Sequence, residues 1–383
     1  MSPAPTDLVR PKSVLGPILV PLLILGLLYA FVCAINVMGG GLKILAQAPA
    51  TEATIQGLFA RAANPVAGLF VGILITSFVQ SSSFTTSLAV GLVATGQISV
   101  VAGVPIVMGA NIGTSVTNIL VSLGHVSARL EFRRAFGAAI VHDIFNVLTV
   151  ALILPIELTT HALSRAAIAL ASVFISPTEA VPTNPLKAAT KPVVDGVRAG
   201  LEHLLAGREE WVGAVMGLVG LAGLFVSLVL LVRVLKRLIL ARLEAFFARY
   251  FFRNWVLALT LGLCVTVMVQ SSSVTTSLVV PLAGAGVLRL HQIFPYTLGA
   301  NIGTTVTSLL AAAATGTPAG LAVASAHLLF NVVGTAVFLP LRAIPIRLAH
   351  WYATLAATRR GLALMYLVVV FFALPILCII LSG

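Results

Sequence analysis

The sequence predicts an all-α polytopic membrane protein with two inverted-topology repeats, about seven full spans and two re-entrant helical hairpins. Three observations lead to this fold class. Hydrophobic residues make up 59% of the 383 and charged residues only 9%, far less charge than a soluble protein of this length carries. Two motifs recur in the same order, 190 residues apart. Two apolar regions also contain hydroxyl-rich runs, which a simple span avoids because unpaired polar groups are costly in a bilayer.

Seven apolar stretches are long enough to cross about 30 Å of hydrocarbon as helices. The first begins near the N-terminus and is too long for the core of a signal peptide, so we expect it to be retained as a span. The three cysteines, Cys33, Cys264 and Cys378, lie in apolar segments, which indicates packing rather than a disulfide framework. The seven expected spans are 14–38, 98–123, 133–157, 211–235, 290–314, 320–341 and 361–382.

Two further apolar regions, 64–95 and 254–286, contain the runs TSFVQSSSFTTSL and TVMVQSSSVTTSL. In the first region the arms 65–79 and 84–95 would rise only about 22 and 18 Å as helices, so neither crosses the membrane comfortably alone. Three consecutive serines favour a break between helices, because their side chains compete for backbone hydrogen bonds. We therefore expect hairpins that enter and leave by one face and turn at Gln-Ser-Ser-Ser. One long span per region is the alternative.

An internal duplication relates the two halves of the chain. QSSSFTTSL and QSSSVTTSL agree at eight of nine positions, and GANIGTSVTNIL (109–120) and GANIGTTVTSLL (299–310) agree at nine of twelve. After a slip of five residues, His142 and Asn146 correspond to His327 and Asn331. Chance does not place two motifs in the same order at one offset, so the chain is predicted to be two copies of one unit.

Basic residues orient the two copies, since cytoplasmic loops of membrane proteins carry an excess of Lys and Arg. With Arg10 and Lys12 inside, the N-terminus is cytoplasmic and the first hairpin enters from outside. The second hairpin follows the basic stretch 233–253 and enters from the cytoplasm; Lys43 and Arg61 are the exceptions to this assignment. The repeats are thus predicted to have opposite orientation, as in many secondary transporters. The net charge of +12 is therefore a topological signal and not a sign of a nucleic-acid partner.

The resulting organisation has five parts. It comprises a first transport repeat at 14–158 with its hairpin at 64–95, an external loop at 159–210, a connecting span and basic cytoplasmic segment at 211–253, a second transport repeat at 254–345 with its hairpin at 254–286, and a C-terminal span at 361–382.

Hairpins that enter from opposite faces would bring their tips together near the middle of the membrane. Carbonyls and hydroxyls at the tips suit a hard cation such as Na⁺, and the helix N-termini after each tip suit an oxyanion. The glycines of each GANIG are predicted to permit a break midway along the next span, where amides and hydroxyls add ligands. The alternative explanation for these residues is that Ser, Thr and Gly, being small, simply let the helices pack closely. The candidate anion- and sodium-binding residues are Gln80, Ser81, Ser82, Ser83, Thr85, Thr86, Asn111, Thr114, Gln270, Ser271, Ser272, Ser273, Thr275, Thr276, Asn301 and Thr304.

Asp143 is the only carboxylate well inside an apolar span, and it sits beside His142. A carboxylate buried in a membrane is a functional candidate. A polar clasp between helices, formed with Asn146, His327 or Asn331, explains it equally well. We therefore keep these five residues as structural or coupling candidates. No transition-metal site and no organic cofactor is expected.

The doubled QSSS and GANIGT motifs resemble those of the type II sodium–phosphate cotransporter family, over about residues 15–345. In that family both QSSS regions form the phosphate and sodium sites. The resemblance therefore implies that Gln80–Ser83 and Gln270–Ser273 bind inorganic phosphate, with Na⁺ as the coupling ion. It also implies Na⁺-dependent phosphate symport by alternating access, in a multi-pass protein surrounded by lipid in the cell (inner) membrane.

Several features depart from the animal members of that family. The loop 159–210 is short and has no cysteine and no Asn-x-Ser/Thr sequon, which indicates a bacterial member. No soluble regulator-like domain follows the last span, which distinguishes the chain from many bacterial relatives. Ala128 stands where electrogenic members have Asp, so the number of Na⁺ ions per phosphate stays open. The sequence also does not give the affinity or the oligomeric state.

Three other functions compete with symport of phosphate. The same architecture could carry another small oxyanion or a carboxylate, and a passive anion channel would use the same groups. An intramembrane hydrolase would use one serine with His142 or His327 and Asp143. Nucleophilic catalysis needs one serine activated by one base, so it does not account for three serines repeated in both halves. The sequence therefore predicts a transporter and not an enzyme.

Overall fold

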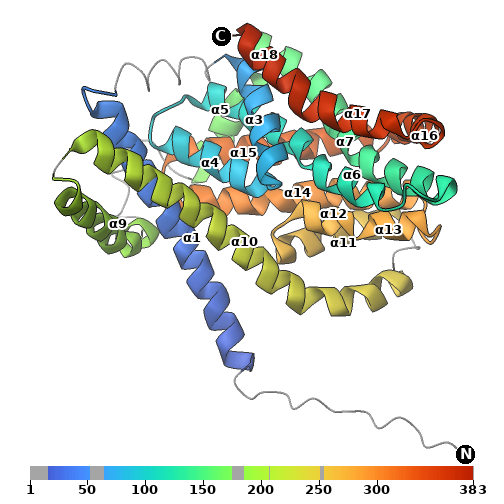
Figure 1. Cartoon of the computed structure of the whole chain (residues 1–383), viewed down its shortest axis with the longest axis horizontal. Coiled ribbons are helices and arrows are strands. Elements are labelled where there is room, and N and C mark those ends of the chain that lie inside the picture. The colour runs from blue at the N-terminus through green and yellow to red at the C-terminus, as the bar shows by residue number, and fades with distance from the viewer. Residues whose placement is uncertain (1–15, 52–63, 175–184, 207, 251–253, 383) are drawn as a thin grey trace, which may run out of the picture.

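The computed structural model describes residues 16–51, 64–174, 185–206, 208–250 and 254–382, with side chains placed except at 16–18, 236–237 and 239–250. Every regular element in these ranges is helical (Figure 1). The helices are α1 (Gly16–Gln47), α3 (Pro65–Val79), α4 (Ser82–Ala94), α5 (Val100–Gly113), α6 (Ser115–Leu123), α7 (Arg129–Thr160), α8 (Ala162–Phe174), α9 (Pro185–Leu204), α10 (Glu209–Tyr250), α11 (Trp255–Val269), α12 (Ser272–Ser277), α13 (Val279–Gly284), α14 (Leu290–Thr315), α15 (Pro318–Phe338), α16 (Ala343–Thr358), α17 (Gly361–Val368), a π-helical turn (Val369–Ala373) and α18 (Leu374–Ser382).

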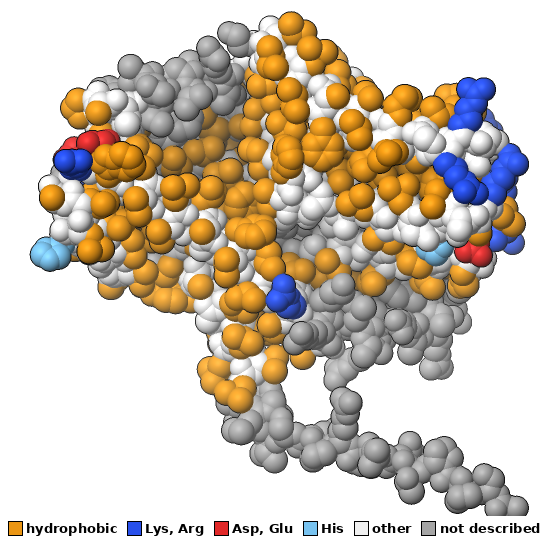
Figure 2. Space-filling model, viewed as in Figure 1, with side chains coloured by type: hydrophobic (Ala, Val, Ile, Leu, Met, Phe, Trp, Pro, Cys, Tyr) orange, Lys and Arg blue, Asp and Glu red, His pale blue; other side chains and the backbone are white. Residues whose placement is uncertain are grey.

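Six helical stretches of the described chain are long and apolar enough to cross a membrane. The seventh expected span, 290–314, is the 26-residue helix α14, whose threonines, glycines and Asn301 make it less apolar than the other six. Most of the face in Figure 2 is hydrophobic, and its charged side chains gather mainly at the two ends. The predicted all-α polytopic membrane protein is confirmed. The six stretches are Leu19–Gln47, Val100–Leu123, Arg129–Thr160, Glu209–Leu235, Pro318–Phe338 and Gly361–Ser382.

Both hydroxyl-rich regions form two helices with a turn at QSSS. Asn64 caps α3 by accepting a hydrogen bond from the Val66 amide (2.9 Å), and Asn254 caps α11 in the same way. Both helices end at a glutamine in the left-handed region, with φ of 59° at Gln80 and 58° at Gln270. The break that the serines predict is thus present in both copies. In Figure 1 the first pair lies above α14 and the second pair below it.

The GANIG glycines all have helical backbone geometry, although the first copy divides into α5 and α6 directly after Gly113. Helix α14 runs without interruption through Gly299 and Gly303, and α5 continues to Gly113, followed by Thr114 in ordinary right-handed geometry. The expectation of a non-helical break at these glycines is therefore wrong. The physical reason is that glycine permits unusual backbone angles but does not require them, and here its small size is what the fold uses.

Close backbone contact explains why glycine is needed at these positions. A Cβ atom on Gly109 would lie 1.9 Å from the carbonyl oxygen of Leu69, and one on Gly299 would lie 1.9 Å from that of Leu259. Helices α3 and α5 therefore touch backbone to backbone, and α11 and α14 repeat the same contact. The duplicated sequence thus builds two nearly identical helix pairs.

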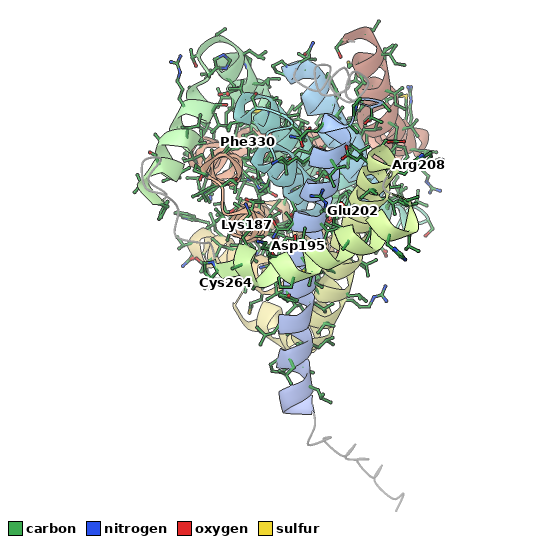
Figure 3. All side chains as sticks on the ribbon, turned by 90° about the vertical axis from the view of Figure 1, so that its left-hand side faces the viewer. Lys187, Asp195, Glu202, Arg208, Cys264 and Phe330 are labelled. Atoms are coloured by element: carbon green, nitrogen blue, oxygen red, sulfur yellow. The ribbon has the colours of Figure 1, made fainter. Side chains whose placement is uncertain are left out.

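The helix that follows each repeat packs against the other repeat. Helix α8 contacts α15, and α16 contacts α7. Small residues make these contacts close, including Ala167 on α8 and Ala349 on α16, both with no exposed surface. The segment predicted as the external loop 159–210 thus contains two helices, α8 and α9; α9 lies across α1 (Figure 3), where Asn36 donates to the Thr190 hydroxyl (3.0 Å).

Part of the sequence-based topology falls on residues that the structure does not describe. Arg10 and Lys12, which set the predicted cytoplasmic N-terminus, lie outside the described residues, as do Arg61 and Arg253. The orientation of the two repeats relative to the membrane stays a prediction.

Candidate functional site

The structure brings the two QSSS motifs into contact. The Ser83 hydroxyl donates to the backbone carbonyl of Gln270 (3.3 Å) and lies 3.4 Å from the Thr307 hydroxyl. Ser83 belongs to the first repeat, whereas Gln270 and Thr307 belong to the second. All three side chains are buried. The tip of the first helix pair therefore sits directly against the tip of the second.

Each tip is held by its glutamine in the same way. The Oε1 atom of Gln80 accepts a hydrogen bond from the Thr117 hydroxyl (2.8 Å), and Oε1 of Gln270 accepts one from Thr307 (2.9 Å). The Nε2 atoms donate to backbone carbonyls one turn earlier, those of Ser77 and Val267. The left-handed conformation costs a non-glycine residue about 1 kcal/mol or more, so glycine would fit the turn better on backbone grounds alone. The side chain explains the glutamine, because it ties the turn to α6 or α14.

Thr117 and Thr307 were not among the predicted site residues. The duplication itself could have indicated them, because both copies of the GANIGT segment have a threonine at this position. The prediction stopped at the first threonine of each motif, Thr114 and Thr304. The hydroxyls of Thr114 and Thr304 donate to carbonyls of their own helices (3.0 and 3.2 Å), and no hydrogen bond links them to the tips.

The serines of the two motifs divide into two roles. The Ser81 hydroxyl accepts from the Phe84 amide (3.2 Å) and caps α4, and Ser271 caps α12 in the same way. The hydroxyls of Ser82, Ser272 and Ser273 have no hydrogen-bond partner among the described residues, although these side chains are only 4%, 3% and 5% exposed. These three oxygens also differ from fully buried hydroxyls without a partner, such as that of Ser87, because they keep some accessible surface. Hydroxyls that are unpaired and still accessible can bind a ligand without breaking an internal hydrogen bond.

The four threonines that follow the serines stabilise the tips. Thr85 accepts from the Thr76 hydroxyl (2.8 Å), and the hydroxyls of Thr86 and Thr275 donate to carbonyls one turn earlier. The Thr276 hydroxyl likewise donates to the Ser272 carbonyl (2.7 Å), and it also accepts a hydrogen bond from Nδ2 of Asn118 (2.9 Å), in the other repeat. These hydroxyls are therefore occupied within the protein.

A buried chain of amides and an imidazole joins the two repeats. Nε2 of His142 lies 2.5 Å from Oδ1 of Asn301, and Nδ2 of Asn301 donates to Oδ1 of Asn146 (2.8 Å). Asn146 donates to the backbone carbonyl of Asn111 (2.8 Å), and Asn331 donates to Oδ1 of Asn111 (3.3 Å). We call these five residues the amide–imidazole chain. Asn111 and Asn301, predicted as ligands at helix breaks, thus form an interface between the repeats.

The amide–imidazole chain continues to the second tip. Nδ2 of Asn118 lies 3.3 Å from Nδ1 of His142 and also reaches Thr276. The equivalent histidine of the second repeat, His327, has its Nδ1 3.0 Å from the Ser308 hydroxyl. Asn118 and Ser308 occupy equivalent positions in the two copies of the duplicated segment. Each of them contacts the histidine of its own half of the chain. Neither contact was predicted from the sequence.

Asp143 does not take part in this chain. Its Oδ2 accepts a hydrogen bond from the hydroxyl of Tyr366 on α17, and its Oδ1 has no partner among the described residues. The predicted clasp of Asp143 with Asn146, His327 or Asn331 is therefore wrong. Adjacent residues of a helix point about 100° apart, so when His142 faces the second repeat, Asp143 must face elsewhere.

Comparison with known proteins identifies the family. Residues 30–177 and 223–378 match the family described as Na⁺/Pi-cotransporter. The chain belongs to the Na⁺/Pi-cotransporter family. The resemblance that the doubled motifs indicated is thereby confirmed, and members of this cotransporter family are transporters rather than enzymes.

Two curated relatives illustrate the extent of the likeness. The chain is 34% identical over 423 residues to sodium-dependent phosphate transport protein 2A of Rattus norvegicus, covering 92% of this chain and 66% of the relative. It is 30% identical over 443 residues to sodium-dependent phosphate transport protein 2B of Homo sapiens, covering 93% and 64%. This Na⁺/Pi-cotransporter family member thus spans about two thirds of the length of the relatives it matches. No solved structure matches it.

Proposed function

We propose that this protein is a secondary active transporter that carries inorganic phosphate together with Na⁺ across the cell (inner) membrane by alternating access. The observation that carries this proposal is the contact between the two QSSS tips, with three serines that are buried as residues and whose hydroxyls have no partner among the described residues. Membership of the Na⁺/Pi-cotransporter family, and relatives named as sodium-dependent phosphate transport proteins, support the choice of ions.

The chemistry of the tips suits an oxyanion that is accompanied by cations. The hydroxyls of Ser82, Ser272 and Ser273 can donate hydrogen bonds to phosphate oxygens. Helix α4 begins at Ser82, so its free amides and partial positive charge point toward the same place. Neither tip contains Lys or Arg. Na⁺, bound by hydroxyl and carbonyl oxygens, would supply the charge that a phosphate needs away from water.

We assign different roles to the residues of each motif. Ser82, Ser83, Ser272 and Ser273 bind the transported ions. Gln80 and Gln270 position the tips through Thr117 and Thr307, and the first serine of each motif caps the helix that follows. The amide–imidazole chain couples a structural change in one repeat to the other, because its hydrogen bonds join the two repeats and extend through Asn118 to the second tip. Binding of Na⁺ and of phosphate at one place then makes each ion favour the other, which is the basis of coupling.

The first expected result concerns sodium. In proteoliposomes that contain the purified protein, uptake of labelled phosphate should fall by about tenfold or more when external Na⁺ is replaced by choline, a coupling within the usual range for linked ligands. Liposomes without protein correct for leakage. Equal uptake in sodium and in choline would exclude the symporter and favour a channel or a proton-coupled carrier.

The second expected result concerns topology. We propose that the N-terminus is cytoplasmic and the repeats are inverted, so the cavity of about 610 Å³ lined by Thr95 opens to the outside. The cavity of about 1010 Å³ lined by Thr354 then opens to the cytoplasm. In a chain whose three cysteines are replaced, Thr95→Cys should react with a membrane-impermeant thiol reagent in right-side-out vesicles, and Thr354→Cys only in inside-out vesicles. Labelling of both positions from one face would exclude the inverted arrangement.

A further inference from the structure

A strongly basic cavity lies apart from the QSSS tips. Its volume is about 1010 Å³, and it is bounded by the start of α7, the end of α13, the start of α14 and one side of α16. Neither QSSS motif contributes to its lining. Figure 2 shows a group of basic side chains at the right-hand end of the molecule, where α16 and the start of α7 lie. The basic side chains that line the cavity are Arg133, Arg134, Arg289, Arg347, His291 and His350.

These arginines are not neutralised by the protein. No Asp or Glu lines the cavity, and within the described ranges none of the four guanidinium groups makes an ion pair. Topology accounts for basic residues in a cytoplasmic loop, but it does not account for four of them around one cavity with no carboxylate. Like charges held this close repel each other, so an anion in the cavity would be favoured.

Helix α16 has three different faces. One face carries buried alanines, including Ala349 and Ala353, and packs against α7. Arg347, His350 and Thr354 line the cavity. A third face is apolar and exposed, and it consists of Ile344, Leu348, Trp351 and Leu355, which are 45%, 40%, 63% and 36% exposed. An exposed apolar stripe that includes a tryptophan, beside a basic face, is typical of a helix that lies in the interface between lipid and water.

We propose that this basic cavity binds the phosphate headgroup of an anionic phospholipid. Guanidinium groups bind phosphate oxygens through paired hydrogen bonds, and basic pockets between membrane helices accept acidic headgroups. The apolar stripe of α16 begins at the edge of the cavity, where Trp351 and Leu355 contribute to both surfaces. It therefore offers the acyl chains a place beside the bound headgroup. Free phosphate would use the arginines but would gain nothing from this stripe.

The test compares lipid retention by the purified full chain in native mass spectrometry. The wild-type protein is delipidated in a non-ionic detergent and titrated with phosphatidylglycerol or phosphatidylcholine. We expect phosphatidylglycerol to be retained and phosphatidylcholine to be lost. The double variant Arg134→Gln/Arg347→Gln should bind phosphatidylglycerol about 30-fold more weakly, from the contribution of each basic residue near an anionic lipid. Arg342→Gln is the matched control, because it removes an exposed arginine next to α16 that does not line the cavity.

Two further measurements make the outcomes decisive. Size-exclusion chromatography and thermal unfolding check that the variants are folded. If the double variant does not fold, the single variant Arg347→Gln, at an exposed position, replaces it. Titration with inorganic phosphate shows whether the cavity binds a lipid headgroup or free phosphate. Retention of phosphatidylglycerol in millimolar phosphate supports the lipid site. Equal binding of both lipids, equal binding by wild type and double variant, or displacement of the lipid by inorganic phosphate overturns it.

Discussion

Replacement of Ser82 and Ser272 together by alanine is expected to abolish Na⁺-dependent phosphate uptake while the protein still folds. Both residues are buried, and each change removes a hydroxyl that has no partner among the described residues, so no internal hydrogen bond is lost. If both hydroxyls donate to a bound phosphate, their removal costs about 3 kcal/mol or more, which corresponds to a loss of about 100-fold or more. Uptake of labelled phosphate into proteoliposomes, normalised to the amount of reconstituted protein, measures the effect.

Ser87→Ala is the matched control for this prediction. Ser87 lies on α4 with the first tip, is completely buried, and also has a hydroxyl without a partner among the described residues. It follows Ser82 by more than one helical turn, so it is outside the contact between the tips. Its substitution should leave uptake close to the wild-type rate. Normal uptake by the Ser82/Ser272 variant would show that the tip serines serve packing and not ion binding.

Substitution of alanine for Gly109 or Gly299 is expected to destabilise the folded protein strongly. The added Cβ would meet a backbone carbonyl at 1.9 Å, and no rotation of a side chain can relieve a clash with backbone. The paired helices, α3 with α5 or α11 with α14, must therefore separate. Overpacking of this kind costs about 3 kcal/mol, and more where the backbone has to move. Thermal unfolding of purified protein in detergent should show a clearly lower midpoint for each variant.

Gly26→Ala tests whether this effect is due to the close contact. Gly26 lies in α1, and nothing lies within 4 Å of a Cβ built on it. Because alanine favours helix more than glycine, by about 1 kcal/mol in an exposed helix interior, this variant should be as stable as the wild type or more so. If Gly109→Ala and Gly299→Ala melt at the same temperature as Gly26→Ala, the helix pairs are not packed as the structure shows.

Much of the fold could be predicted because its signals are local. An apolar run of spanning length indicates a membrane helix whatever its neighbours are, and three serines after a glutamine disfavour a continuous helix. The breaks at Gln80 and Gln270 were therefore found in the right place. The glycines of GANIG were misread, because a glycine in a sequence does not tell whether its freedom of conformation or its small size is used. Only the position of Leu69 and Leu259 opposite them decides that.

The candidate site was predicted in part, for a related reason. The duplication pointed to Ser82 and Ser272 because the same residues recur at one offset, and repetition is visible without a structure. Which hydroxyls are already used is a matter of contacts over long distances along the chain. Within GANIGTSVT, the Thr114 hydroxyl bonds to its own helix, whereas the Thr117 hydroxyl donates to Gln80 at the tip.

Composition, the lengths of the apolar runs and the repeated motifs were enough to predict a duplicated, all-helical membrane protein that resembles the sodium–phosphate cotransporters, because these features do not depend on how the helices pack. Which polar groups contact each other could be read only from the packing of the helices. Asp143 and His142 are neighbours in the chain, yet the turn of a helix directs one to Tyr366 and the other to Asn301 in the opposite repeat. The basic cavity likewise exists only because α16 brings Arg347 back to Arg134, more than two hundred residues earlier.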